Sequence, residues 1–388
     1  MEDPTLAELM LADLEQLIRC ESPSSDPEAL RRCADLLSDI GTARLGSAPV
    51  RAEAGGKPVL RFGPADPTVL LLGHLDTVHP HGTLAEAPYR VDEGRVYGPG
   101  VFDMKAGLVQ ALHAMAGAEY RDQVALLVTS DEELGSPESR SVIEAAALGT
   151  KAVLVLEASS AGRLKTARKG VSNYELVFTG RAAHAGLEPE KGANACLAMA
   201  HAVIAVAGLA SEGTTVTPTV ASAGATSNTV PDRASLLVDV RALTSTEQER
   251  VDLAMRALVS EVPDVRVEVV GGINRPPLDP DSSARLFDLA QEVATELGLR
   301  ALESAHVGGG SDGNFTAGLG IDTLDGLGAV GDGAHTRHEW TDVAALVDRT
   351  RLVSALVDRI VSDQPGADRA DADRADADQA GVDREVTG

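Results

Sequence analysis

The chain has 388 residues, of which 44% are hydrophobic, and this is enough for two domains with sizeable cores. Its 59 acidic residues outnumber its 34 basic residues, so the formal net charge is −25. Such a charge repels phosphate backbones and anionic lipids, which argues against nucleic acid and membrane surfaces as partners. The 3 cysteines form no C-x-x-C pair, and the sequence shows neither a signal peptide nor a membrane-spanning stretch. We therefore expect a cytoplasmic protein with reduced cysteines.

The first half of the chain predicts two helices and then an alternation of strands and helices. Leucine spacing predicts a helix over residues 5–19, and a Ser-Asp-Pro-Glu start predicts a second helix that ends at Gly41. Apolar runs typical of buried parallel strands follow at 68–73, 124–130 and 152–157. Helical patterns separate these runs, at 105–118 and 137–149. This order predicts a doubly wound α/β domain.

The pattern changes near Val171, where half-exposed alternating strands and two helical runs predict a smaller α+β domain. The helix–strand pattern of the first half resumes at Pro276. We therefore expect an α/β catalytic domain with a doubly wound mixed sheet, formed by residues 1–170 and 276–362. An inserted α+β lid and dimerisation domain would occupy residues 171–275. The five-residue repeats in 363–388 hold no apolar side chain large enough to form a core, and they predict a disordered acidic tail.

Residues of the kinds that bind metal follow each buried strand. In an open α/β sheet, ligands bind beyond the carboxyl ends of the strands, so these side chains would meet at one edge. Asp103 lies on a loop before a helix and would reach the same edge. Histidine nitrogen and carboxylate oxygen are ligands that zinc accepts, and two-zinc sites share a bridging carboxylate. The residues at the three strand ends are His74, Asp76, Asp131, Glu132, Glu133 and Glu157.

The spacing within this set indicates a division of roles. In His74-Leu-Asp76 the histidine would bind metal, and the aspartate would accept the other ring N–H. Of the adjacent Glu132 and Glu133, one would bind metal and the other would take a proton from water. Taken singly, a histidine at a strand end is more often a hydrogen-bonded structural residue, and acidic residues after a strand more often form a solvated turn. Their joint placement predicts a metal site.

Seven motifs then identify a family. They are GHLDTV, GPGVFDMKAG, SDEELGS, VLEAS, GRAAHAG, SNTVPD followed by VDVR, and GDGAHTRHEW. In order and spacing they resemble the motifs of the di-zinc aminoacylase and glutamate carboxypeptidase family of metallopeptidases, over Leu6 to Val361. The resemblance implies two Zn²⁺ per subunit, with Co²⁺ or Mn²⁺ as alternatives, and a homodimer formed through the lid. It also implies hydrolysis of an amide bond in a small peptide or N-acyl amino acid.

The resemblance implies the metal ligands residue by residue. Asp103 would bridge both zinc ions. His74 and Glu157 would complete one site, and Glu133 and His335 would complete the other. His338 is a second candidate within the motif that holds His335.

It also implies the groups that act on the substrate. Glu132 would be the general base, and it would later protonate the leaving nitrogen. Asp76 would orient His74. His184 would reach the active site of a neighbouring subunit and stabilise the oxyanion. Asn228 and Arg241 match positions of the lid that hold the substrate.

Two cations indicate the substrate. Lys165 and Arg275 match positions at which glutamate-releasing members bind the substrate carboxylate, and an arginine can pair with it through two N–H groups. Both favour release of a C-terminal acidic amino acid, glutamate first. The alternative interpretation is that they are ordinary surface cations.

Other functions stay open at this point. A deacylase of acetyl- or succinyl-amino acids would use the same groups. A catalytically silent, small-molecule-binding relative would have little reason to keep Glu132 together with all five ligands. The glycine-rich run 308–315 lacks the lysine of a phosphate-binding loop, so we interpret it as a tight active-site loop.

Overall fold

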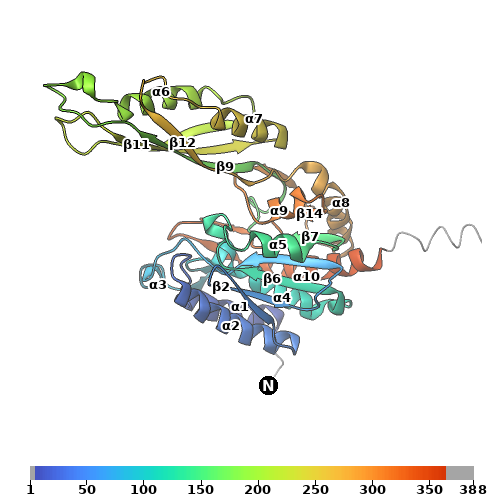
Figure 1. Cartoon of the computed structure of the whole chain (residues 1–388). Helices are drawn as coiled ribbons and strands as arrows, with labels where there is room; N and C mark the ends of the chain where they lie inside the picture. The colour runs from blue at the N-terminus through green and yellow to red at the C-terminus, as the bar shows by residue number, and fades with distance from the viewer. Residues whose placement is uncertain (1–4, 364–388) are drawn as a thin grey trace, which may run out of the picture.

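The computed structural model describes residues 5–363, which form a layered α/β unit and a smaller sheet-and-helix unit above it (Figure 1). The acidic repeats predicted to be disordered lie outside the described residues, apart from Asp363. No helix within residues 5–363 is long and apolar enough to cross a membrane.

The larger unit is built on a six-stranded mixed sheet in the order β1-β2-β6-β3-β7-β14. Strands β6, β3, β7 and β14 run parallel, and the β1–β2 hairpin joins antiparallel to β6. The predicted fold class is therefore confirmed. The strands are β1 (Val50–Ala54), β2 (Lys57–Phe62), β3 (Val69–His74), β6 (Val124–Thr129), β7 (Ala152–Val155) and β14 (Thr323–Leu324).

Helices cover both faces of this sheet, which explains why the central strands are apolar along their whole length (Figure 1). The core on one face includes α1 (Leu6–Arg19), α2 (Pro27–Leu45), α4 (Ala106–Gly117), α8 (Pro280–Glu296) and α10 (Val343–Ser362). The core on the other face includes α5 (Arg140–Ala147) and α9 (Gly313–Gly318). The short helix α3 (Thr83–Glu86) lies at the edge of the unit.

The prediction that the second helix ends at Gly41 was wrong. Gly41 is buried, and a Cβ at that position would lie 2.2 Å from the Phe62 ring. The residue is glycine because α2 packs closely on β2. The helix ends at Gly46, whose φ of 76° gives the left-handed cap that glycine favours.

Residues 171–275, here called the inserted segment, fold around their own antiparallel sheet in the order β10-β11-β9-β12. Helices α6 and α7 pack on one face of this sheet and enclose a separate apolar core (Figure 1). The elements are β9 (Gly170–Thr179), α6 (Ala195–Ala207), β10 (Thr215–Ala223), β11 (Arg233–Ala242), α7 (Ser245–Arg256) and β12 (Arg266–Arg275).

Two small sheets beside the central one were not predicted. One has the order β15-β16-β5-β4, and the other pairs β8 with β13. Their strands have two to five residues, too few for a clear alternation of polar and apolar side chains. They are β4 (Arg90–Asp92), β5 (Arg95–Tyr97), β8 (Leu164–Arg168), β13 (Ser304–Val307), β15 (Gly331–Asp332) and β16 (Trp340–Asp342).

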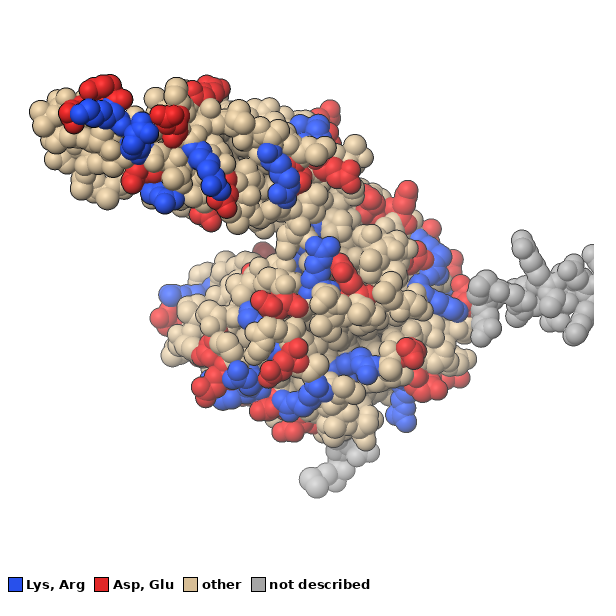
Figure 2. All heavy atoms as spheres, viewed as in Figure 1, with Lys and Arg blue, Asp and Glu red and all other residues tan. Residues whose placement is uncertain are grey.

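The negative charge is not gathered in one patch on the face shown in Figure 2. Acidic and basic side chains alternate over both units there, and the inserted segment projects over the larger unit with open space beneath it.

Candidate active site

We call the residues predicted to bind metal or to activate water the metal-type residues: His74, Asp103, Glu132, Glu133, Glu157 and His335. Five of them lie at the carboxyl edge of the parallel strands. His74 is the last residue of β3, and Glu132 and Glu133 form a short turn after β6. Glu157 follows β7, and Asp103 lies in the loop before α4. Because β3 pairs in parallel with both β6 and β7, the three strand ends deliver these side chains to one place.

Three of these residues form a first group. The Nε2 atom of His74 lies 3.4 Å from Oδ1 of Asp103 and 3.5 Å from Oε1 of Glu157. Nε2 is buried and has no hydrogen-bond partner among residues 5–363. A buried, unpaired ring nitrogen between two carboxylates is an arrangement that a cation would complete.

A second group shares Asp103. The Nε2 atom of His335 lies 3.4 Å from Oδ2 of Asp103 and 3.3 Å from Oε2 of Glu133. His335 has a φ of 64°, a conformation that non-glycine residues seldom adopt outside special sites. His338, the alternative candidate, instead lines a cavity with Glu86 and Arg337.

The donor sets fit two zinc ions. The distances of 3.3–3.5 Å within each group exceed those of ordinary hydrogen bonds. Two ligands of one tetrahedral zinc ion, each at about 2.0–2.1 Å, lie roughly 3.3–3.4 Å apart. Although burial opposes it, the carboxylates of Asp103, Asp76 and Glu157 raise the pKa of His74 well above its ordinary value. The carboxylates of Asp103 and Glu133 raise the pKa of His335 to about 10.

Asp76 faces the His74 ring and also has a second set of contacts that was not expected. The Nδ1 atom of His74 is 2.9 Å from the main-chain oxygen of Asp76 and 3.4 Å from its Oδ1. The Asp76 carboxylate also accepts hydrogen bonds from the main-chain N–H groups of Glu132 and Glu133, both at 3.2 Å. Ser24 donates a further hydrogen bond to it. Asp76 therefore holds the acidic turn in place next to His74.

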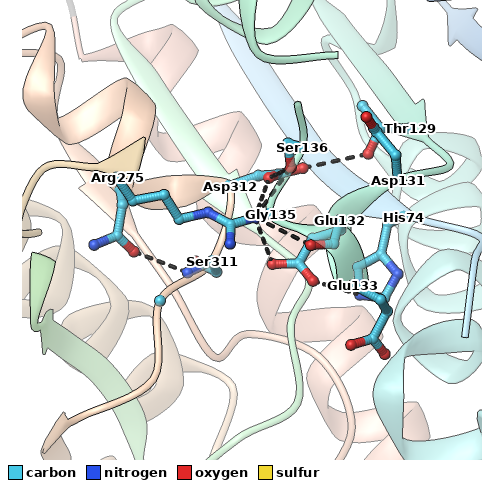
Figure 3. Close-up of polar contacts among 12 residues, drawn as sticks. His74, Thr129, Asp131, Glu132, Glu133, Gly135, Ser136, Arg275, Ser311 and Asp312 are labelled. Carbon is cyan, nitrogen blue, oxygen red and sulfur yellow. Dashed lines mark hydrogen bonds and ion pairs between the residues drawn. The ribbon is translucent and has the colours of Figure 1, made fainter. Parts of the chain in front are cut away.

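The carboxylate of Glu132 faces the His74 side of the site and is paired with an arginine (Figure 3). The Nη2 atom of Arg275 lies 2.9 Å from Oε1 of Glu132 and 2.9 Å from Oδ1 of Asp312. Arg275 is 6% exposed, so it is not a surface cation. Burial raises the pKa of the Glu132 carboxyl well above its usual range, against the opposing effect of Arg275.

The glycine-rich run 308–315 packs against this arginine, as an active-site loop would. A Cβ at Gly310 would lie 3.1 Å from Cδ of Arg275. Asp312, from the same loop, accepts hydrogen bonds from Ser136 and Thr129 as well as from Arg275 (Figure 3).

Sequence reasoning missed Asp312 and Arg168, two buried charged residues near the site. The Arg168 guanidinium donates to the Asp325 carboxylate and to the main-chain oxygens of Gly309 and Gly310. It also lies 3.8 Å from Oε2 of Glu157. The Asp in SDGN and the Arg in ARKG were the available signals, but neither has a metal-type spacing.

Lys165 lies in a cleft of about 770 Å³ whose lining includes Phe102, directly before Asp103, and Arg168, which lies 3.8 Å from Glu157. Burial lowers the pKa of its ammonium group. No hydrogen bond or ion pair of this ammonium is found within residues 5–363, so its charge is available to an anion. The cleft is lined by both apolar and polar side chains, including Phe102, Ser159, Ser160, Arg168, Val330 and Trp340.

The three residues predicted to act from a lid, His184, Asn228 and Arg241, form no hydrogen bond or ion pair with the metal-type residues in the part of the chain that the structure describes. His184 and Asn228 lie together, because the Ala185 N–H donates to the Asn228 main-chain oxygen at 2.9 Å. Arg241 pairs with Asp239. The Nδ1 atom of His184 accepts main-chain N–H groups at 3.1 and 3.2 Å, so its proton is on Nε2, which is then the available donor.

Two glycines, from different parts of the chain, pack closely on the residue that follows β7. A Cβ at Gly107 or at Gly328 would lie 2.1 Å from the main-chain oxygen of Leu156. Leu156 directly precedes Glu157, so only glycine at these positions allows the backbone to place Glu157 where it lies.

A shared carboxylate between two metal-type groups, with a further carboxylate beside them, defines a class of hydrolase with a dinuclear metal centre. The sequence profile of peptidase family M20/M25/M40 matches residues 70–359. The chain belongs to this family. It is 30% identical to carboxypeptidase G2 of a Pseudomonas species over 370 residues, which cover 90% of this chain and 88% of that protein.

Shorter parts of the chain match desuccinylase and deacetylase enzymes. The chain is 38% identical over 139 residues to succinyl-diaminopimelate desuccinylase of Methylobacterium nodulans, covering 32% of this chain and 34% of that enzyme. The protein is thus a hydrolase related to carboxypeptidase G2 and, through shorter matches, to deacylating enzymes.

Solved structures agree on the fold. An M20 metallo-carboxypeptidase of Sulfolobus solfataricus superposes with a TM-score of 0.73 at 18% identity, covering 90% of this chain and 99% of that one. A Bacillus subtilis protein described as a dinuclear metal-binding peptidase superposes with a TM-score of 0.59 at 15% identity, covering 91% and 98%.

Proposed function

We propose that this protein is a di-zinc carboxypeptidase that hydrolyses an amide bond and releases a C-terminal acidic amino acid, glutamate first. The observation that carries this proposal is the pair of metal-type groups joined at Asp103, with the Glu132 carboxylate beside them. The substrate is a small peptide or an N-acyl amino acid. Co²⁺ and Mn²⁺ are the alternative ions.

The residues divide the work as follows. His74, Glu157, Glu133 and His335 would hold two cations with Asp103, and such cations polarise a carbonyl group and lower the pKa of water. Glu132 takes the proton of the attacking water and passes it to the leaving nitrogen. Burial raises the pKa of Glu132 above its usual range, which makes its carboxylate a stronger proton acceptor.

Lys165 favours a substrate that releases an acidic amino acid. It is a half-buried cation in the cleft that forms no ion pair within residues 5–363, so a substrate carboxylate would neutralise it. Arg275 is already paired through Nη2, but its Nε has no hydrogen-bond partner among the described residues. That Nε is buried, so a substrate carboxylate would reach it only after the residues that cover it rearrange.

His184 would act from a second subunit. It is exposed and away from the metal-type residues of its own chain, with Nε2–H as its donor. Strand β10 is an edge of its sheet, and on the adjacent helix α6 Leu197 and Ile204 are 48% and 75% exposed. A free strand edge beside an apolar helix face favours pairing of two copies of this segment. In such a dimer His184 would stabilise the oxyanion.

A deacylase is the second candidate, favoured by the matches to desuccinylase and deacetylase enzymes. It would use the same residues on an acetyl- or succinyl-amino acid.

A panel of substrates separates the two. The zinc-loaded protein is incubated with N-acetyl, N-succinyl and N-benzoyl amino acids, glutamyl peptides and folate-type glutamates, and released amino acid is measured. Release of glutamate or aspartate supports the carboxypeptidase. Turnover of neutral or basic acyl-amino acids alone would support the deacylase, and no turnover with two zinc ions bound would contradict both.

A further inference from the structure

A buried carboxylate next to the metal-type residues has no role in the proposed reaction. Glu339 is 1% exposed and lies four residues after His335, directly before β16. Its side chain points to the loop that carries Asp103. Its main-chain oxygen also accepts the N–H group of Gly98, because β16 pairs with β5.

Both carboxylate oxygens of Glu339 are used to hold that loop. Oε1 accepts the main-chain N–H groups of Phe102 at 3.0 Å and Asp103 at 2.7 Å. Oε2 accepts the N–H group of Gly100 at 2.7 Å and lies 2.9 Å from Nε2 of His79. Three main-chain donors and one imidazole thus converge on a single buried side chain. Charge-assisted hydrogen bonds of this kind are about twice as strong as neutral ones.

These contacts connect the two loops on which the second metal-type group depends. One loop carries Asp103, which belongs to both groups, and the other carries His335. We propose that Glu339, with His79 as its partner, is a positioning residue that sets Asp103 at the correct distance from His335 and His74 for two cations. The inference rests on the proposed function, since it assigns Glu339 a role toward the same dinuclear centre.

A purely structural role would predict a different outcome. A glutamate that only stabilises the fold would lower the melting temperature when replaced, without a specific effect on metal binding. The chain offers a matched control in Asp13, another buried carboxylate, which lies 2.8 Å from Nε2 of His113. Its remaining hydrogen bonds come from Arg44, and none reaches a metal-type residue.

The test is a Co²⁺ titration of the metal-free full chain, followed by visible absorption, with Co²⁺ as the probe. We expect the unmodified protein to bind two Co²⁺ per chain. Glu339→Gln places an NH₂ group against main-chain N–H donors, so we expect both ions to bind at least tenfold more weakly with an altered spectrum. His79→Phe removes one of the four contacts, and we expect a smaller loss in the same direction. Asp13→Asn should lower the melting temperature and leave the titration unchanged.

The outcomes are distinct. Wild-type affinity and spectrum in both Glu339→Gln and His79→Phe would overturn the positioning role while leaving the proposed function intact. If Glu339→Gln does not fold, His79→Phe decides the matter alone. If Asp13→Asn weakened Co²⁺ binding equally, general destabilisation would explain the effect, and the inference would also be overturned. Absence of Co²⁺ binding by the unmodified protein would overturn the proposed function itself.

Discussion

Arg275 and Glu132 are joined by an ion pair of 2.9 Å, although they come from different parts of the chain. Arg275 ends β12 of the inserted segment, and Glu132 follows β6 of the central sheet. The guanidinium at the position expected to bind the substrate carboxylate therefore also contacts the carboxylate proposed as the general base. The same Nη2 atom holds Asp312, so one buried cation neutralises two carboxylates.

Replacement of Arg275 should be costly to stability. Arg275→Met leaves Glu132 and Asp312 buried without their cation, and we expect the free energy of unfolding to fall by about 3 kcal/mol. Urea denaturation measures this. The double variant with Asp312→Asn should lose less than the sum of the two single variants, because one of the stranded charges is gone. If the two losses of unfolding free energy added exactly in the double variant, the pairing of Arg275 with Asp312 would be contradicted.

Glu132→Gln should abolish most turnover and leave metal content unchanged. The amide has the shape of the carboxylate but cannot accept the proton of water, so we expect a loss of about 10²–10⁴-fold in kcat. Metal analysis of the same sample should still give close to two ions per chain. Loss of an ion would mean that Glu132 is a ligand and that its role has been assigned wrongly.

His184→Ala should lower kcat without removing metal. The histidine offers Nε2–H to developing negative charge, and loss of one such donor costs about 10²–10³-fold. His201→Ala is the control, since His201 lies on α6 of the same segment and pairs with Glu261. Unchanged kcat in His184→Ala would exclude the oxyanion role.

Ile204→Glu should separate the subunits. Ile204 is 75% exposed in the single chain, so a glutamate there should leave the monomer folded but place charge in the proposed interface. Analytical ultracentrifugation would show a shift from dimer to monomer. Leu253→Glu, on α7 and 71% exposed, is the matched control. Dissociation by Leu253→Glu alone would locate the interface on the other helix.

Asp13→Asn should remove a pH-dependent part of the stability. Burial opposes it, but hydrogen bonds from His113 and Arg44 hold the pKa of Asp13 below its usual value. A lowered folded-state pKa stabilises the protein above the unfolded-state pKa of about 3.9, and this contribution is lost as pH falls through the folded-state value. We expect a loss of about 2 kcal/mol at pH 7 that shrinks below about pH 4. A stability difference between the two proteins that did not change with pH would contradict the ionic contacts of Asp13 with His113 and Arg44.

The layered fold was predictable because its long elements carry clear periodicity. Strand β3 is apolar throughout, which only a sheet covered on both faces explains, and α10 repeats leucine and valine at helical spacing. Gly41 misled the sequence interpretation, because a glycine that ends a helix and one that allows close packing on Phe62 look identical in a sequence.

The metal-type residues were predictable for a related reason: strand order alone brings His74, Glu132 and Glu157 to one edge. Arg168, Asp312 and Glu339 were not, since their partners are main-chain groups and side chains far away in the sequence that no local pattern specifies. The Asp76 carboxylate lies near His74 as expected, but spacing does not reveal that the shorter contact of the ring is with the Asp76 main-chain oxygen. The cytoplasmic location stays a prediction.

The two glycines beside the Leu156 oxygen show that chemical function can depend on residues that have no side chain. Gly107 belongs to α4 and Gly328 follows β14, yet both limit how far the backbone ahead of Glu157 can shift. Adding a single methyl group at either position would displace a metal-type carboxylate without altering any polar atom. A survey of related enzymes that compares only their acids, bases and histidines would therefore overlook two of the positions on which the centre depends.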